Sequence, residues 1–252
     1  MGFGTEFYLV AAFVVLLTGI SKSGFGAGLE MMAVPVMALF VAPQIAAGIM
    51  LPILLAIDAA NLWRYRADWD RRMVVIMGCA ALIGIVIGTF TFQYFSEDLL
   101  KLFLGLLALA FVLQRLVFPP PQSGVRKPGS GFTGLMGALS GLTSFVAHAG
   151  GPPSKIVLLS QGYSNRRFVG TNSYLFALIN VMKCVPYYFL GQLSVQNLGA
   201  SLSLAPFVVA GIITGFWLSG VVPQTWFNRI VICALVLVGL KLVWDGSASI
   251  FA

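Results

Sequence analysis

Long apolar runs separated by short polar loops occupy most of the chain. A helix that crosses a bilayer needs about 20 predominantly apolar residues. Six segments have this length, at roughly 44–64, 73–93, 98–118, 168–190, 197–220 and 225–244. The pattern therefore predicts an all-α polytopic membrane protein.

Two further regions, 5–41 and 131–161, contain an apolar run, a glycine-rich break and a shorter apolar run. The breaks are "GISKSGFGAG" (19–28) and a second stretch around "HAGGPPS" (148–154). Broken backbone is tolerated in lipid only where it is buried in protein or lines a cavity. We expect a broken or re-entrant helical hairpin in each region.

Composition supports the membrane assignment. Hydrophobic residues make up 59% of the chain and charged residues 9%, which leaves too few polar side chains to cover a water-soluble surface. The net charge of +7 comes from basic residues scattered through short loops, so we expect no nucleic-acid partner. The expected surroundings are a lipid bilayer, in the cell membrane (the bacterial inner membrane).

The basic loops also predict an orientation, because loops rich in Lys and Arg stay on the cytoplasmic side. If both hairpins return to the side from which they entered, all loops fall on consistent sides. Both termini then lie outside. The residues expected inside are Arg64, Arg66, Arg71, Arg72, Arg115, Arg126, Lys127, Arg166, Arg167 and Arg229.

The chain contains an internal repeat. A shift of 122 residues aligns Gly19 with Gly141 and Gly48 with Gly170, and a shift of 127 places "GIVIG" (84–88) over "GIITG" (211–215). We predict a first transmembrane repeat at 1–118, a cytoplasmic linker at 119–130 and a second repeat at 131–252. Each repeat has four to five helical segments and opens with a broken hairpin.

The threading gives the two repeats opposite orientations. The helix from 44 runs inward and its partner from 168 runs outward, which is an inverted repeat. Many secondary transporters have this architecture, with a site near the midplane where broken helices meet. A parallel repeat is the alternative, since it needs only that each hairpin count as one crossing.

Polar residues inside the apolar segments mark a candidate site. A charged side chain at the bilayer centre costs about 2.5–3.5 kcal/mol on insertion scales, so such residues usually face a pathway. Asp58 matches Asn180 in the repeat and Asn61 matches Lys183, and each pair of positions lies three residues apart on one helix face. The predicted substrate-binding set is Ser21, Lys22, Ser23, Gly24, Gly26, Asn61, Thr143, Ser144, Gly150, Gly151, Thr171, Asn172, Asn180 and Lys183.

These residues favour an anion. A short helix is expected to begin after each break, near Ala27 and near Pro152, and its free N–H groups and dipole attract negative charge. Lys22 and Lys183 would add positive charge. Because Ser144 stands where the first repeat has Lys22, the two halves supply charge unequally. A small anionic substrate is therefore expected, with no cofactor and no metal.

Several residues have a second interpretation. Asp58 and His148 are candidates for a coupling proton, but Asp58 could instead neutralise Lys183 or Lys22, and His148 could be a hydrogen-bonded filler beside the break. Glu30 and Lys155 are expected to pair with loop groups near a membrane surface. The GxxxG pairs, Gly84 with Gly88 and Gly211 with Gly215, suit close helix packing, and the tryptophans suit interface anchoring.

An enzyme is not expected. The "ALSG" sequence around Ser140 and the nearby His148 lack a third group for nucleophilic catalysis. The chain has no Walker motif, HExxH or dinucleotide fingerprint.

The paired breaks and the stretch "NRRFVGTNSYLFALINVMKCVPYYFLG" resemble the TauE/SafE sulfite exporter family, also called TSUP. The resemblance implies transport of sulfite, small organic sulfonates or related sulfur anions. The first half departs from the common "GIGGG" pattern and has Lys22 in its break. The positions that match the family motifs are Gly24, Gly26, Gly28, Gly150, Gly151, Pro152, Pro153, Gly170, Thr171, Asn180 and Lys183.

The expected function is a secondary transporter of small sulfur-containing anions, proton-coupled or driven by another gradient. The alternatives are a passive anion channel and a membrane subunit that scaffolds a partner enzyme. A monomer and a homodimer both remain open.

Overall fold

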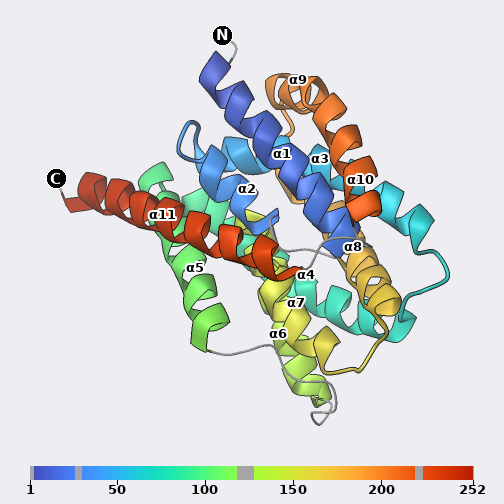
Figure 1. Cartoon of the computed structure of the whole chain (residues 1–252). Coiled ribbons are helices and arrows are strands. Elements are labelled where there is room, and N and C mark those ends of the chain that lie inside the picture. The colour runs from blue at the N-terminus through green and yellow to red at the C-terminus, as the bar shows by residue number, and fades with distance from the viewer. Residues whose placement is uncertain (1–2, 26–29, 118–127, 219–223, 252) are drawn as a thin grey trace.

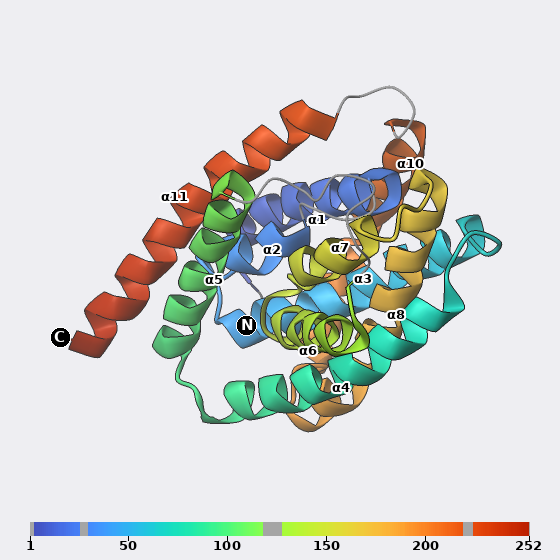
Figure 2. The same ribbon diagram turned by 90° about the horizontal axis from the view of Figure 1, so that it is seen from below.

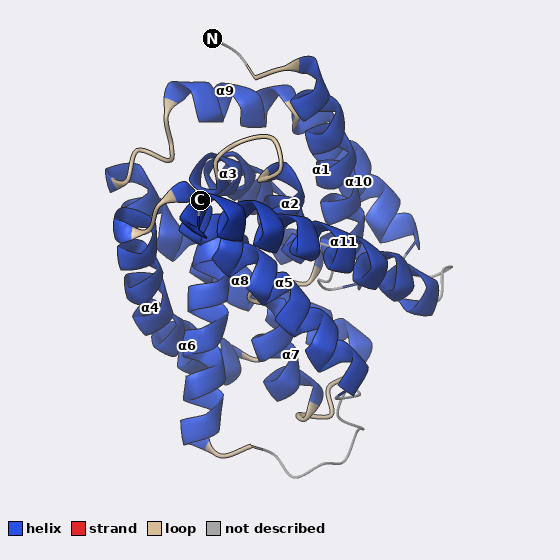
Figure 3. Cartoon of the chain, turned by 90° about the vertical axis from the view of Figure 1, so that its left-hand side faces the viewer, coloured by secondary structure: helices blue, strands red, loops and turns tan. Residues whose placement is uncertain are grey.

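Helices make up nearly all of the computed structural model, which describes residues 3–25, 30–117, 128–218 and 224–251. No strand occurs within these ranges (Figure 3). The helices, in the order shown in Figure 1, are α1 (Thr5–Phe25), α2 (Glu30–Met37), α3 (Pro43–Arg64), α4 (Arg71–Tyr94), α5 (Glu97–Val117), α6 (Ser130–Ala147), α7 (Gly151–Leu159), α8 (Asn165–Phe189), α9 (Val195–Ser203), α10 (Ala205–Leu218) and α11 (Gln224–Phe251).

Helix α1 continues through most of the stretch that the sequence predicts to be broken. Residues 19–25 are helical, so the expectation of a break from Gly19 is wrong. A Cβ atom at Gly19 would lie 2.9 Å from the Cα of Gly211, and one at Gly24 would lie 2.5 Å from the carbonyl oxygen of Gly215. These glycines therefore let α1 and α10 pack closely. The expected break residues Gly26, Ala27 and Gly28 lie outside the described residues.

The second hairpin has the predicted form. Helix α6 ends at Ala147, His148 takes a left-handed conformation with φ of 51°, and α7 begins at Gly151. Pro152 and Pro153 occupy the first turn of α7, where a missing N–H costs nothing because that N–H would have no partner inside the helix. The sequence expectation of a proline-started short helix is confirmed.

The segment predicted as one helix over 197–220 is two helices, which corrects that assignment. Helices α9 and α10 meet at Leu204 with a bend of 47°. Pro206 explains the break, because its ring lacks an N–H and clashes with the carbonyl of the preceding turn. The hydroxyl of Ser201, one turn earlier, donates to the carbonyl of Ile49 in α3 at 2.7 Å.

Several helices have the length and hydropathy to cross a membrane. Over the described residues these are Thr5–Gly24, Pro43–Arg64, Arg71–Tyr94 and Asn165–Phe189, and the bent pair α9–α10 is a fifth if it counts as one span. The chain is therefore a multi-pass membrane protein.

The helices pair crosswise between the two halves of the sequence. Helix α1 packs on α10 (Figure 1), while α6 packs on α4 and α5 packs on α11 (Figure 2). The GxxxG glycines lie at these contacts: a Cβ atom at Gly211 would meet the carbonyl oxygen of Leu16 at 2.7 Å, and one at Gly84 would overlap the carbonyl oxygen of Ala138. The prediction that these glycines allow close packing is confirmed.

Helices α3 and α8 pack together in opposite directions. Gly170, near the start of α8, lies against Tyr65, just after the end of α3. At the other end, Gly48 near the start of α3 lies against Gln192, just beyond α8. These two helices, which the sequence predicts to be repeat counterparts, therefore run antiparallel to each other.

The loop between α3 and α4 is held against the start of α8 by ion pairs. Arg166 pairs with Asp68 at 2.5 Å and Arg167 pairs with Asp70 at 3.3 Å. Asp70 also accepts hydrogen bonds from the Tyr163 hydroxyl at 2.9 Å and from the N–H of Met73 at 3.0 Å, where it caps α4.

Two residues of this region have roles that the sequence does not predict. The hydroxyl of Thr171 accepts a hydrogen bond from the N–H of Asp70 at 2.9 Å. Thr171, expected in the substrate site, therefore fastens this loop. Trp69 stacks on Tyr174 with ring centroids 4.1 Å apart, so it packs the loop rather than serving only as an interface anchor. Trp63, Trp217 and Trp244 are each at least 70% exposed, as interface anchors require.

The glycine packing predicts a contrast within α6. Gly141→Ala places a methyl group against the backbone of Ala81, while Gly134→Ala meets nothing within 4 Å. We expect Gly141→Ala to cost about 1–3 kcal/mol through overpacking. Gly134→Ala should be neutral or slightly stabilising, because alanine is the better helix former. Thermal unfolding in detergent measures both, and equal unfolding temperatures would contradict the packing role.

The loop contacts predict an acid-sensitive contribution from Asp70. Partial burial alone would raise the pKa of this carboxyl, but the Met73 N–H, the Tyr163 hydroxyl and Arg167 together hold its pKa below the usual value. A lowered folded-state pKa gives stability that is present at neutral pH and is lost as the pH falls through that pKa. Asp70→Ala should cost about 1 kcal/mol at neutral pH through loss of the cap.

The control for this prediction is Asp70→Asn, which keeps a capping oxygen but has no charge. The difference between wild type and Asp70→Ala should shrink in acid, whereas the difference between Asp70→Asn and Asp70→Ala should not depend on pH. Thermal unfolding temperatures across the acid range test this. A wild-type advantage that persists unchanged into strong acid would show that the charge contributes nothing.

Candidate functional site

The last carbonyls of α1 receive hydrogen bonds from α3. The side-chain amide of Asn61 donates to the carbonyl of Lys22 at 3.3 Å, and the hydroxyl of Tyr65 donates to the carbonyl of Ser23 at 3.5 Å. The last four carbonyls of any helix have no partner within it. These two side chains therefore supply donors where α1 ends inside the protein.

The second repeat makes the same pair of contacts. The ammonium of Lys183 donates to the carbonyl of Ser144 at 3.0 Å, and the hydroxyl of Tyr187 donates to the carbonyl of Phe145 at 2.5 Å. All four residues sit 122 positions after their counterparts in the first repeat. The chemical difference is that Lys183 stands where the first half has the neutral amide of Asn61.

A buried ion cluster lies at the end of α1. The Lys22 ammonium is 2.6 Å from Asp58 and 3.9 Å from Glu30, and all three side chains are at most 3% exposed. The amide of Asn180 donates to the other Asp58 oxygen at 2.6 Å. Asp58 thus neutralises Lys22, one of the two partners that the sequence leaves open. The charge that the sequence assigns to Lys22 for substrate binding is already balanced.

Lys183 and His148 form a second buried cluster. Besides the Ser144 carbonyl, the Lys183 ammonium reaches the Ser144 hydroxyl at 3.1 Å and Nδ1 of His148 at 2.7 Å. Nε2 of His148 lies 3.0 Å from the carbonyl oxygen of Ala47. A neutral ring that accepts at Nδ1 and donates from Nε2 satisfies both contacts. His148 is therefore a fully bonded residue that connects α8 to α3.

Lys183 differs from Lys22 in its lack of a counter-ion. It is fully buried, and among the described residues no carboxylate lies within ion-pair distance of its ammonium. Its described hydrogen-bond partners are a carbonyl, a hydroxyl and an imidazole, all neutral as bonded. The side-chain nitrogen of Lys183 therefore has no carboxylate counter-ion among the described residues.

Glu30 belongs to the buried ion cluster around Lys22, where the sequence did not place it. The expectation that it pairs with loop groups near a membrane surface is wrong, since it is 3% exposed and faces Lys22. Lys155, half-buried on α7, also acts electrostatically on Glu30. The position of Glu30 directly after a glycine-rich break is the sequence signal that could have identified it.

The other predicted site residues divide into two groups. The hydroxyl oxygen of Ser154 lies 2.9 Å from the carbonyl oxygen of Gly151 and 3.2 Å from the side-chain oxygen of Asn172, and its single proton can be donated to either, so these three residues meet at the start of α7. Ser154 was not among the predicted residues. By contrast, the hydroxyl of Thr143 donates back to the carbonyl of Leu139 within its own helix.

The glycine-rich tip of the second repeat approaches α6 closely. A Cβ atom at Gly150 would lie 2.5 Å from the carbonyl oxygen of Ser140 and 3.0 Å from Cβ of Ser144. No side chain caps the start of α7. Ser21, Ser23 and Gly24 lie on the last turn of α1, and Gly26 is outside the described residues.

Several buried polar atoms around these clusters lack partners. Within the described part of the chain, the buried uncharged oxygens without a hydrogen bond are Ser23 Oγ, Gln44 Oε1, Asn61 Oδ1, Ser140 Oγ and Asn180 Oδ1. Buried polar atoms without partners are uncommon, because leaving one unpaired costs about 1–3 kcal/mol. They are groups that a small polar ligand could satisfy.

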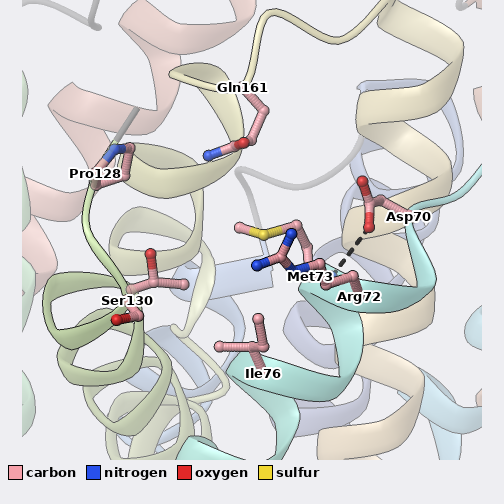
Figure 4. A pocket seen from close by; sticks show the side chains of 8 residues that line it. Asp70, Arg72, Met73, Ile76, Pro128, Ser130 and Gln161 are labelled. Atoms are coloured by element: carbon pink, nitrogen blue, oxygen red, sulfur yellow. Dashed lines mark hydrogen bonds between the residues drawn. The ribbon is translucent and has the colours of Figure 1, made fainter. Parts of the chain in front are cut away.

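A separate cavity of about 280 Å³ lies at the end of the molecule that carries the α3–α4 loop (Figure 4). It lies between the starts of α4 and α6 and contains none of the predicted site residues. Its walls are formed by Asp70, Arg72, Met73, Ile76, Pro128, Ser130, Thr133 and Gln161.

Comparison with known proteins identifies the family. The family model described as sulfite exporter TauE/SafE matches residues 11–242, which is most of the chain. The search of curated proteins and the search of solved structures returned no match. Since the match covers both hairpins, both buried clusters and most of the helices, the chain belongs to the sulfite exporter TauE/SafE family of membrane transporters.

Proposed function

We propose that this protein is a secondary transporter that carries a small sulfur-containing oxyanion or sulfonate, and that the anion binds at Lys183. The observation that carries the proposal is a buried ammonium with no carboxylate partner among the described residues. An unpaired charge in a protein interior is strongly destabilising. A bound anion would supply the counter-charge.

The internal repeat supports a functional role for this charge. Asn61 does for α1 what Lys183 does for α6, and it does so with a neutral amide. Fastening the helix end therefore needs a donor but no charge. The positive charge at Lys183 is extra to the fold, which is the pattern expected of a residue selected for its ligand.

The surrounding groups suit a small oxyanion. The unpartnered oxygens of Ser140 and Ser23 belong to hydroxyls that can also donate. Lys22 is held by Asp58 and contributes less net charge than the sequence suggested. We therefore place the selectivity for anions at Lys183 rather than at Lys22.

The helix arrangement supports alternating access between inverted repeats. The crosswise packing of α1 on α10 and α6 on α4, and the antiparallel pairing of α3 with α8, are what a two-fold axis between the halves would produce. Asp58 and Asn180 are repeat-equivalent and contact each other, as expected for residues beside such an axis. In inverted-repeat transporters the substrate site lies at this interface.

The positions of the basic loops support the orientation that we propose in the cell membrane. The α3–α4 loop and the start of α8, both expected inside, are joined at one end of the molecule by Arg166 and Arg167. With that end in the cytoplasm, both termini would lie outside.

The unpaired charge predicts separable effects on binding and stability. Lys183→Gln keeps a hydrogen-bond donor but removes the charge, so it should abolish the rise in unfolding temperature caused by sulfite, sulfate, thiosulfate or sulfonates. The ligand-free variant should be at least as stable as wild type, because no ion pair is broken. Scanning calorimetry or fluorescence in detergent measures both quantities.

Two variants serve as controls for the Lys183 prediction. Lys241→Gln, on an exposed residue of α11, should bind the same anions as wild type. Asp58→Asn should lower the ligand-free unfolding temperature, because it removes the carboxylate that holds Lys22, and breaking a buried pair costs about 3–5 kcal/mol. Normal anion binding by Lys183→Gln would contradict the proposed site.

A transporter and a channel differ in exchange kinetics. Liposomes preloaded with unlabelled sulfite should take up labelled sulfite by counterflow, at a rate that saturates with concentration. An ohmic current without counterflow would instead indicate a passive channel.

A further inference from the structure

Glu30 is a buried carboxyl that the proposed anion site does not use. Among the described residues, neither of its oxygens accepts a hydrogen bond. Its nearest described cation is the Lys22 ammonium at 3.9 Å, and that ammonium lies 2.6 Å from Asp58. One lysine therefore lies between two carboxyls and favours Asp58.

The two carboxyls have opposite surroundings. Asp58 is held by the Lys22 ammonium and the Asn180 amide, so its charged form is well solvated by the protein. Among the described residues Glu30 has no such donors, and an ionised carboxylate buried without them is far more costly than a neutral one. This arrangement of side chains suits an ionised Asp58 and a Glu30 that carries a proton.

We propose that Glu30 is the proton-binding residue of the transport cycle, and that Lys22 moves from Asp58 towards Glu30 when the proton leaves. The inference rests on the proposed function as an anion transporter. The proton passes from a Glu30 carboxyl oxygen to water that enters when the site opens. The resulting carboxylate takes Lys22 as its counter-ion, while Asp58 keeps the amide of Asn180. No covalent bond other than O–H changes.

The other buried candidates suit this role less well. Protonation of Asp58 would weaken its contacts to both Lys22 and Asn180. Protonation of His148 would place a second cation against the Lys183 ammonium, 2.7 Å away. Asp58 and His148 are the candidates that the sequence offers for a coupling proton. Protonation of Glu30 disrupts neither set of contacts. The charged groups that act on Glu30 are Lys22 from α1, Asp58 from α3, Lys155 from α7 and Lys183 from α8.

The location of Glu30 connects its charge to helix movement. It is the first residue of α2, whereas Asp58 lies on α3 and Lys22 on the last turn of α1. With Lys22 on Asp58, the end of α1 is fastened to α3. With Lys22 on Glu30, the ion pair lies within the α1–α2 hairpin, and α1 loses this connection to α3. Gain or loss of one proton would thus change how firmly the hairpin is held.

The test separates gradient-driven transport from exchange, using Glu30→Gln in proteoliposomes. The probes are labelled sulfite and methanesulfonate, the second because its charge stays constant across the pH range. Glutamine imitates the protonated carboxyl, so exchange of labelled for unlabelled probe should stay within about twofold of wild type. Accumulation driven by a pH gradient should fall about tenfold or more, within the range of coupling between two ligands.

Glu6→Gln is the matched control, because Glu6 is exposed at the start of α1 and should leave both activities unchanged. Gradient-driven accumulation that persists in Glu30→Gln would overturn the proposal. Loss of both exchange and gradient-driven accumulation in a correctly folded variant would also overturn it. An unfolding temperature of Glu30→Gln at pH 5 well below that of wild type would overturn the proposal too, since a neutral side chain should fit at position 30.

The wild-type results separate this inference from the proposed function. Exchange by wild type without any response to a pH gradient would refute proton coupling alone, whereas no exchange of either probe would refute the transporter proposal as well.

Discussion

The arrangement depends on how the protein satisfies the backbone where a helix ends away from water. The last carbonyls of α1 and α6 have no intrahelical partners, and lipid offers none. In each half two side chains four residues apart, on or directly after the third helix, supply donors to two consecutive carbonyls: Asn61 and Tyr65 in the first half, Lys183 and Tyr187 in the second. This requirement places α3 and α8 at the centre and fixes the hairpins against them.

The two halves of the sequence differ in charge at matching positions, and the proposed function rests on that difference. The repeat fixes the geometry twice, so a residue that differs between the copies is one that the geometry does not require. Lys183 adds a charge where Asn61 has none, and Lys22 adds one where Ser144 has none. The protein balances the second charge with Asp58 and leaves the first without a described counter-ion. The proposed anion site rests on this difference between the two lysines.

Close backbone contact explains why so many glycines occur in apolar helices. Gly19, Gly24, Gly84 and Gly211 each lie against the backbone of a helix from the other repeat. In lipid, where the hydrophobic effect does not drive helices together, such contacts and the polar groups between them supply much of the association. The crosswise packing therefore makes the two halves one structural unit, while the break between α9 and α10 is set locally by Pro206.

The sequence by itself determined the class of protein, most helix positions and the broken hairpin of the second half, because hydropathy and helix-breaking residues can be read from residue order. It also singled out Lys22, Asp58, Asn61, Asn180 and Lys183, since polar residues are rare in apolar segments. Only the tertiary structure decided which charge meets which. Lys22 pairs with Asp58, Thr171 fastens a loop and Glu30 is buried, because ion pairing depends on distances between helices that residue order does not contain. For the same reason the sequence alone does not show that Gly19 and Gly24, which look like helix breakers, let α1 pack closely against α10.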